Sequence, residues 1–153
     1  MDGGCACGTV RYRLKSAPLF VHCCHCTWCQ RESGSAFAVN ALIETSRVDL
    51  TADRPEPVPT PSSSGRGQIY LRCSKCHVAL WSHYSGAGPK FAFLRVGTLD
   101  HPHDVNPDIH IFTSTKRPWV ILPEGVPAVP EYYDREKYWP ATSLARRAAV
   151  IAD

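Results

Sequence analysis

Short stretches of alternating hydrophobic and polar residues recur along the chain. In the segment 9–14, Val10, Tyr12 and Leu14 alternate with threonine and arginine, which is the period-two pattern of a half-buried strand. The segment 91–96 alternates again, and shorter apolar runs predict further strands at 19–21, 35–43, 47–51, 68–72, 78–81, 109–113 and 119–122. Because their connections are rich in proline and glycine, the pattern predicts a mainly β fold.

Only the last segment has the pattern of a helix. Leu144, Ala148 and Ile151 lie near one face, and Thr142 or Ser143 can cap the first turn. A helix of about ten residues is marginal in water, so it needs to dock on the rest of the protein. We therefore expect a short C-terminal helix.

The segment 52–67 separates the two halves of the chain. Its prolines at 55, 57, 59 and 61, followed by three serines, exclude a central strand and predict a surface loop. With 153 residues and 44% hydrophobic content, the chain fits one core. We expect a single domain over residues 1–130 with the loop 52–67 inserted, and a C-terminal extension, 131–153, that packs on it or is partly flexible.

Charge and hydropathy exclude some classes of function. The formal charge is +3 and the basic residues are scattered, so the chain lacks the electrostatic footprint of a nucleic-acid-binding protein. No apolar run approaches the ~20 residues that cross a bilayer, and no basic segment followed by an apolar stretch marks the N-terminus as a secretory signal. The expected location is the cytoplasm, without a membrane partner.

The eight cysteines fall into groups with the spacing of metal ligands. They form CxC at 5 and 7, CxCxxC from 24 to 29 and CxxC at 73 and 76, with Cys23 left over. The cytosol keeps thiols reduced, and disulfide scaffolds rarely cluster in this way. Metal binding is therefore the leading interpretation, and a thiol-redox protein is its rival.

Two of the groups together supply four thiolates. The turn carrying Cys5 and Cys7 leads into the first predicted strand, and the CxxC of Cys73 and Cys76 lies between two others. Two strands that meet at a CxxC turn aim both sulfurs at one point, as in many zinc knuckles. We predict a closed, structural zinc on these four residues.

The remaining group, Cys24, Cys26 and Cys29, provides three ligands and leaves the fourth position of a tetrahedral metal open. The polar segment 30–34 after it predicts one helical turn or a loop. The alternative is a second closed site, completed by Cys23 or by one of His22, His25, His77, His83, His101, His103 and His110. Cys23 fits poorly, because neighbouring side chains point apart along an extended backbone. Spacing alone does not decide between an open and a closed site.

Four motifs resemble one known family. The runs GGCACGTVRY, CHCTWCQRESGSAF, RCSKCHVALW and DIHIFTSTKRPWV occur in the order seen in the glutathione-dependent formaldehyde-activating enzymes, whose domain is shared with centromere protein V. The resemblance covers Gly4 to about Pro130. It implies a mainly β fold of small antiparallel sheets clamped by zinc in a β-tent-like arrangement. It also implies two zinc ions per chain, one structural on Cys5, Cys7, Cys73 and Cys76 and one catalytic on Cys24, Cys26 and Cys29.

The resemblance further implies the chemistry. The expected activity is that of a carbon–sulfur lyase similar to S-(hydroxymethyl)glutathione synthase, with glutathione as co-substrate and formaldehyde or a related aldehyde as its partner. Candidate substrate contacts are Trp28, Arg31 and His110, and Lys116 or Arg117 can approach through the fold. A non-catalytic zinc-binding interaction module is the alternative. The sequence departs from the family at His77, where glycine is frequent, at Cys23 and in the length of the proline-rich loop.

Overall fold

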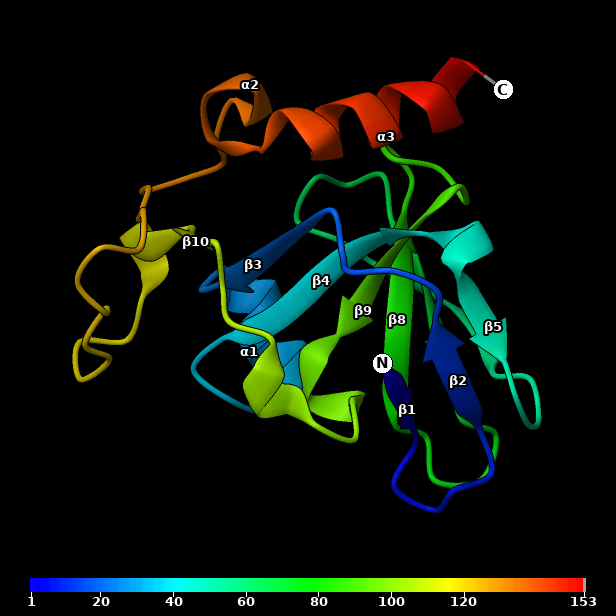
Figure 1. The fold of residues 1–153 in the computed structure, drawn as a ribbon. Coiled ribbons are helices and arrows are strands. Elements are labelled where there is room, and N and C mark those ends of the chain that lie inside the picture. The colour runs from blue at the N-terminus through cyan, green and yellow to red at the C-terminus, as the bar shows by residue number, and fades with distance from the viewer. Residues whose placement is uncertain (153) are drawn as a thin grey trace.

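The computed structural model describes residues 1–152, and Asp153, the last residue of the expected extension, lies outside them. A small sheet has the order β1-β2-β5, with β1 at Asp2–Gly4, β2 at Arg11–Leu14 and β5 at Val48–Leu50. A larger sheet has the order β10-β3-β4-β9-β8-β7-β6 (Figure 1). Its strands are β3 (Phe20–Cys24), β4 (Ala38–Glu44), β6 (Glu56–Thr60), β7 (Gln68–Arg72), β8 (Ala79–Tyr84), β9 (Phe91–Arg95) and β10 (Ile109–Ile111).

The two faces of the larger sheet pack against different parts of the chain. One face carries Val21, Ile43 and Leu94, which pack with Tyr12 and Leu14 of the small sheet. The opposite face packs with the C-terminal segment in a second cluster, whose buried members are Leu19, Phe20, Cys24, Cys29, Ala38, Leu42, Phe91, Ile109, Ile111 and Trp139. Because side chains alternate along a strand, neighbouring residues of β3 contribute to different clusters.

Neighbouring strands pair antiparallel throughout both sheets, except that β10 runs parallel to β3. The mainly β prediction is therefore confirmed. The predicted strand at 119–122 is wrong: this segment is a turn and coil, with Trp119 73% and Ile121 92% exposed. Val120 is buried, but the run has no partner strand to pair with, so it does not form a strand.

The proline-rich segment contains a strand that the sequence analysis assigned to a loop. β6 forms the outer edge of the large sheet, and it pairs with β7 from Glu56 opposite Arg72 to Thr60 opposite Gln68. Pro57 and Pro59 are two residues apart, so both present the same backbone edge, the one that needs no N–H donor, toward solvent. The prolines thus exclude a central strand, as expected, but they permit an edge strand.

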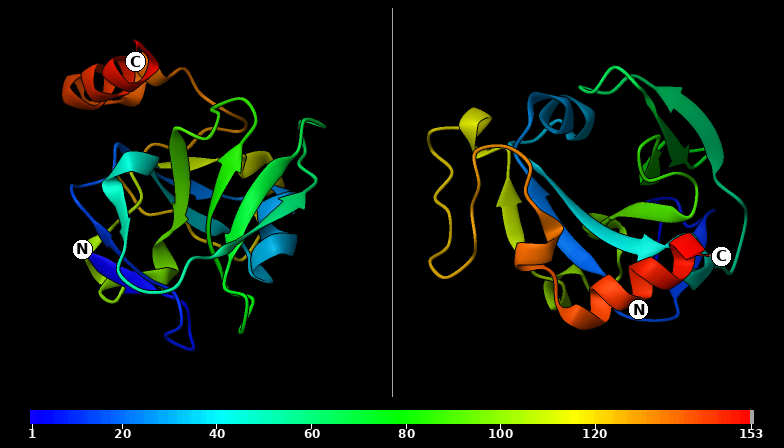
Figure 2. Two further views of the ribbon diagram at one scale, coloured as in Figure 1. Left: turned by 90° about the vertical axis from the view of Figure 1, so that its right-hand side faces the viewer. Right: turned by 90° about the horizontal axis from the view of Figure 1, so that it is seen from above.

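The helices are short and gather at two places. α1 (Thr27–Ser33) directly follows β3, while α2 (Arg135–Tyr138) and α3 (Ala141–Ala152) lie across one end of the large sheet (Figure 1 and Figure 2). Single 3₁₀ turns are η1 (Thr45–Arg47), η2 (Val96–Thr98), η3 (Pro102–Asp104) and η4 (Thr113–Thr115). No helix within residues 1–152 is long and apolar enough to cross a bilayer.

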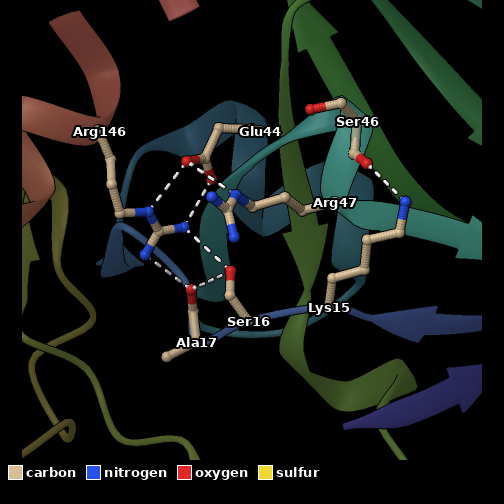
Figure 3. A network of polar contacts seen from close by, with 7 residues as sticks. All are labelled: Lys15, Ser16, Ala17, Glu44, Ser46, Arg47 and Arg146. Atoms are coloured by element: carbon tan, nitrogen blue, oxygen red, sulfur yellow. Dashed lines mark hydrogen bonds and ion pairs between the residues drawn. The ribbon is translucent and has the colours of Figure 1, made fainter. Parts of the chain in front are cut away.

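A buried carboxylate anchors α3 to the sheets (Figure 3). Glu44, at the end of β4, is 1% exposed, and both of its oxygens accept hydrogen bonds from Arg146 of α3, at 3.0 and 2.7 Å. Arg47 lies 3.3 Å from the same carboxylate. Arg146 also donates to the Ser16 hydroxyl and the Ala17 carbonyl. The C-terminal helix is therefore fixed by a charged network as well as by its apolar contacts.

Candidate metal centres

The first cysteine group forms where two turns meet. Cys5 and Cys7 lie in the turn between β1 and β2, and Cys73 and Cys76 lie in the turn between β7 and β8. The sulfurs of Cys5 and Cys7 are 3.5 Å apart and those of Cys7 and Cys73 are 3.7 Å apart, with all four within 4.8 Å of one another. Four sulfurs at about 2.3 Å from one tetrahedral zinc would be about 3.8 Å apart, so this group fits a closed zinc site.

Backbone N–H groups around this cluster point at the sulfurs. Val10 donates to Cys5 Sγ at 3.2 Å and Lys75 donates to Cys73 Sγ at 3.4 Å. The Thr9 hydroxyl and backbone N–H lower the pKa of Cys7 to about 6. His77 closes the second turn with a φ of 59°, a left-handed conformation in which glycine is favoured, and its N–H bonds the Cys73 carbonyl. The departure at His77 thus falls on a position where glycine would be less strained.

The second group, Cys24, Cys26 and Cys29, is hereafter the triad. Cys24 ends β3, Cys26 is the N-cap of α1, and Cys29 lies in the first turn, so the strand-to-helix junction brings the three sulfurs within 4.8 Å of one another. α1 is longer than the single turn or loop expected, because the Cys26 sulfur caps it by accepting from the Cys29 N–H at 3.3 Å, and Gly34 ends it at a φ of 65°.

The triad has three candidate ligands and no fourth within residues 1–152. No other cysteine, histidine or acidic side chain there comes within the distance that joins the three sulfurs, and Cys23, His25 and His110 form a separate group. Cys24 and Cys29 are buried, whereas Cys26 is half-buried. Hydrogen bonds from the Cys24 and Cys29 thiols lower the pKa of Cys26 to about 2, and the contact with Cys26 raises the pKa of Cys24. The first thiolate of the triad thus forms at its most accessible sulfur.

A cation and two phenols lie near the triad on the same face of the sheet. Arg95 follows Phe91 and Phe93 along β9, and it donates to Asn40 Oδ1 at 2.7 Å and to the Tyr70 hydroxyl. Burial raises the pKa of Tyr70 to about 12, with Arg95 acting to lower it and the Cys29 thiolate to raise it. Burial, and then the Cys29 thiolate, raises the pKa of Tyr84 as well. Arg95 has no carboxylate partner within residues 1–152.

Two hollows flank α1. One, of about 540 Å³, is lined by Glu32 of α1, Arg72 of β7 and Arg95, and it reaches Cys76 and His77. The other, of about 810 Å³, is lined by Thr27, Gln30, Arg31, Gly34, Ser35, Ala36, Thr115, Arg117 and Trp119. The first hollow is thus bordered by two guanidinium groups, of which Arg72 is paired with Glu32. None of the triad cysteines lines either hollow.

The predicted substrate contacts are scattered. Trp28 is half-buried on α1, and Arg31 is exposed and lines the larger hollow. Lys116 donates to the Val120 carbonyl at 2.7 Å. His110 is buried beside His25 rather than at the triad. The sequence analysis missed Arg95, although an arginine that continues the apolar side of an alternating strand, FAFLR, was a signal.

Comparison with known proteins identifies the family. The family model "Glutathione-dependent formaldehyde-activating enzyme" matches residues 1–115. The chain belongs to this family. The residues after 115, including α2 and α3, lie beyond the match. No curated protein matches the chain at a significant level.

One solved structure supports the fold. A crystal structure of a Rhodobacter sphaeroides protein superposes with a TM-score of 0.50 at 20% identity, covering 70% of this chain and 92% of that chain. At this identity the likeness concerns the fold alone. The fold of this chain thus also occurs in a protein of low sequence identity, nearly all of which superposes on it.

Proposed function

We propose that this protein is a zinc-dependent carbon–sulfur lyase that joins glutathione to formaldehyde, or to a related aldehyde, and cleaves the same adduct in reverse. Membership of the family supports glutathione-dependent formaldehyde activation in general. The observation that carries the finer proposal is the triad, in which three sulfurs converge and no fourth side chain of residues 1–152 joins them. Such a set leaves a coordination position for an external thiol.

The triad residues are suited to hold zinc. Three sulfurs within 4.8 Å of one another, at a helix N-terminus and with a low pKa at Cys26, form a thiolate donor set that soft and borderline metals prefer. When bound there, zinc would keep an incoming thiol deprotonated while leaving its sulfur nucleophilic. We propose that Cys5, Cys7, Cys73 and Cys76 hold the second, structural zinc.

The residues around the triad would bind and orient the substrates. The half-buried Cys26 marks the side from which glutathione approaches. Arg95, whose charge acts on Cys29, would offset the negative charge that three thiolates bring to a divalent ion. It also lines the hollow between α1 and β7, where its guanidinium would bind a glutathione carboxylate. In the reaction the glutathione sulfur forms a C–S bond to the carbonyl carbon, and the thiol proton ends on the carbonyl oxygen. The step therefore needs no oxidant or reductant.

Magnetization-exchange NMR tests this function, because the adduct also forms unaided and only an acceleration is informative. We expect the exchange between formaldehyde and its glutathione adduct to be faster with the zinc-loaded protein than without it. Cys26→Ser should lose the acceleration, and His101→Ala, in an exposed loop, should retain it. Exchange at the spontaneous rate with the wild-type protein would contradict the proposal and favour a non-catalytic interaction module.

A further inference from the structure

A third group of metal-ligating side chains lies beside the triad, on the other face of the sheet. It consists of Cys23, His25 and His110, and its ligand atoms lie within 4.8 Å of one another. We propose that these residues form a third transition-metal site with one thiolate and two imidazole ligands. The proposal rests on this group alone and does not depend on the function proposed above.

The register of the sheet explains why the three side chains meet. Along β3, Cys24 belongs to the cluster that faces the C-terminal segment, so Cys23 points to the opposite face. β10 pairs parallel to β3 with His110 directly opposite Cys23, and Ile109 and Ile111 on the Cys24 side. His110 therefore shares a face with Cys23. His25, two residues after Cys23, returns to that same face.

The positions of the ligand atoms fit one shared ion. His25 Nε2 lies 3.0 Å from His110 Nδ1 and 3.6 Å from Cys23 Sγ. Zinc lies about 2.0–2.1 Å from imidazole nitrogen and about 2.3 Å from thiolate sulfur, so tetrahedral ligand atoms around it are separated by roughly 3.3–3.6 Å. The sulfur–nitrogen distance lies in this range, and the nitrogen–nitrogen distance is a few tenths of an ångström shorter, so the two rings would separate slightly around an ion. A pair of histidines that only shared a hydrogen bond would not require a cysteine sulfur to converge on the same point.

All three residues of the group are buried from solvent. Cys23 is 2%, His25 0% and His110 6% exposed. One contact joins the two rings, while His25 Nδ1 and His110 Nε2 have no hydrogen-bond partner within residues 1–152. Neither of these two nitrogens is the atom that would bind the ion. The support for the site is therefore the convergence of one buried thiol and two buried imidazoles on one point.

Hydrogen bonds from the surrounding segments hold the backbone of His25 in place. Its carbonyl accepts hydrogen bonds from Gln30 Nε2 at 2.7 Å and from the Thr115 hydroxyl at 3.0 Å, and its N–H donates to Ile111 at 3.0 Å. Three separate segments, α1, η4 and β10, therefore fix one residue. Preorganised ligands of this kind lower the cost of binding an ion.

The donor set selects the class of metal. One thiolate with two imidazoles suits zinc and copper, whereas magnesium and calcium require oxygen ligands that this group lacks. Within residues 1–152 no acidic side chain joins the three. The site would therefore be three-coordinate, which copper(I) accepts, or would take one further small ligand with zinc.

Metal stoichiometry tests the proposal. The apoprotein is titrated separately with Zn²⁺ and with Cu⁺ under reducing conditions, and bound metal is measured after desalting. We expect the wild type to bind one equivalent more than both Cys23→Ser and His110→Gln, for at least one of the two ions. His101→Gln, an exposed histidine, should bind as much as the wild type. Equal binding by the wild type and Cys23→Ser with both ions would overturn the proposal.

Anomalous diffraction keeps the test decisive if the variants do not fold. Crystals of the wild-type protein saturated with zinc, and separately with copper, would be measured at the absorption edge of each metal. An anomalous peak between Cys23, His25 and His110 in either crystal supports the site. Peaks confined to the other two cysteine groups would overturn it.

Discussion

At the residue scale, the chemistry is concentrated in side chains that the strand β3 and the helix α1 place next to one another. The cysteine spacing predicted the grouping of the sulfurs, and the structure brings each group together. Spacing did not reveal Arg95, because its relevance depends on β9 lying beside β4, a pairing between residues far apart in sequence. The sequence did not reveal the grouping of His110 with Cys23 for the same reason, since that grouping requires the parallel pairing of β10 with β3.

Replacing Arg95 with glutamine should weaken glutathione binding. The guanidinium is the cation that continues the triad face of β9, and a lost charge-assisted contact corresponds to about 1.5–3 kcal/mol, or roughly a tenfold rise in the dissociation constant or more. Calorimetric titration of the zinc-loaded protein measures this. The exposed Arg54→Gln is the matched control. Unchanged affinity in Arg95→Gln would place the glutathione carboxylates elsewhere.

His22 should make the protein less stable in mild acid. It is 2% exposed, its Nε2 lies 2.6 Å from the Tyr133 hydroxyl, and burial lowers its pKa from 6.5 to about 4. Between these two pKa values, His22 binds a proton in the unfolded chain but not in the folded protein. His22 therefore lowers the free energy of unfolding as the pH falls below about 6.5 toward 4, by up to about 3 kcal/mol. Above about pH 6.5 this loss is absent.

Urea unfolding of the wild type and of His22→Phe at several pH values measures this effect. Acid also protonates the cysteine thiolates, so the informative quantity is the difference in unfolding free energy between the two proteins at each pH. That difference should shift in favour of His22→Phe as the pH falls from 7 to 5. A difference that does not vary with pH would contradict the buried, neutral His22.

At the scale of the elements, strands marked by a local sequence pattern were predicted, whereas those that depend on tertiary pairing were missed. The strand at 68–72 was predicted with its observed bounds from a short apolar run, although Gln68 and Tyr70 are its buried residues and Ile69 is exposed. β6 was missed because proline argues against strands in general, whereas an edge strand needs N–H donors on one side only. α1 exceeds the predicted single turn because a cysteine sulfur supplies its N-cap.

Arg146→Met should release α3 from the sheets. The substitution leaves the buried Glu44 carboxylate with only the partly exposed Arg47, and breaking a buried pair in this way costs about 3 kcal/mol. We expect a lower urea midpoint and faster proteolysis after residue 130. Lys137→Met, an exposed residue of α2, is the control. Equal midpoints for the two variants would show that apolar contacts alone hold the C-terminal helix.

At the scale of the whole molecule, one structure is made of two sheets, a C-terminal segment and a group of four cysteines, hereafter the clamp, formed by Cys5, Cys7, Cys73 and Cys76. The clamp joins the turn after β1 to the turn before β8, so it links the small sheet to the far half of the large one. The sequence predicted this link from the cysteine groups alone. It did not predict which face each sheet buries, because that depends on the register between strands distant in the chain.

Removal of the metal from the clamp should destabilise the entire fold. Zinc contributes about 10–16 kcal/mol of apparent binding energy in small zinc-dependent peptides, so we expect several kcal/mol here. Cys73→Ser should lower the melting temperature and make it insensitive to a chelator, whereas Ser74→Ala, an exposed residue of the same turn, should melt like the wild type. A melting curve of the wild type that does not change on chelation would count against a structural metal.

The central claim is that the triad binds a metal and leaves one position for an external thiol. The most direct test is to titrate the cobalt-substituted protein with glutathione and to record the ligand-field bands. We predict a saturable change in the wild type that is absent in Cys26→Ser. An unchanged spectrum of the wild type at millimolar glutathione would contradict the claim, because no external thiol would then have entered the coordination sphere.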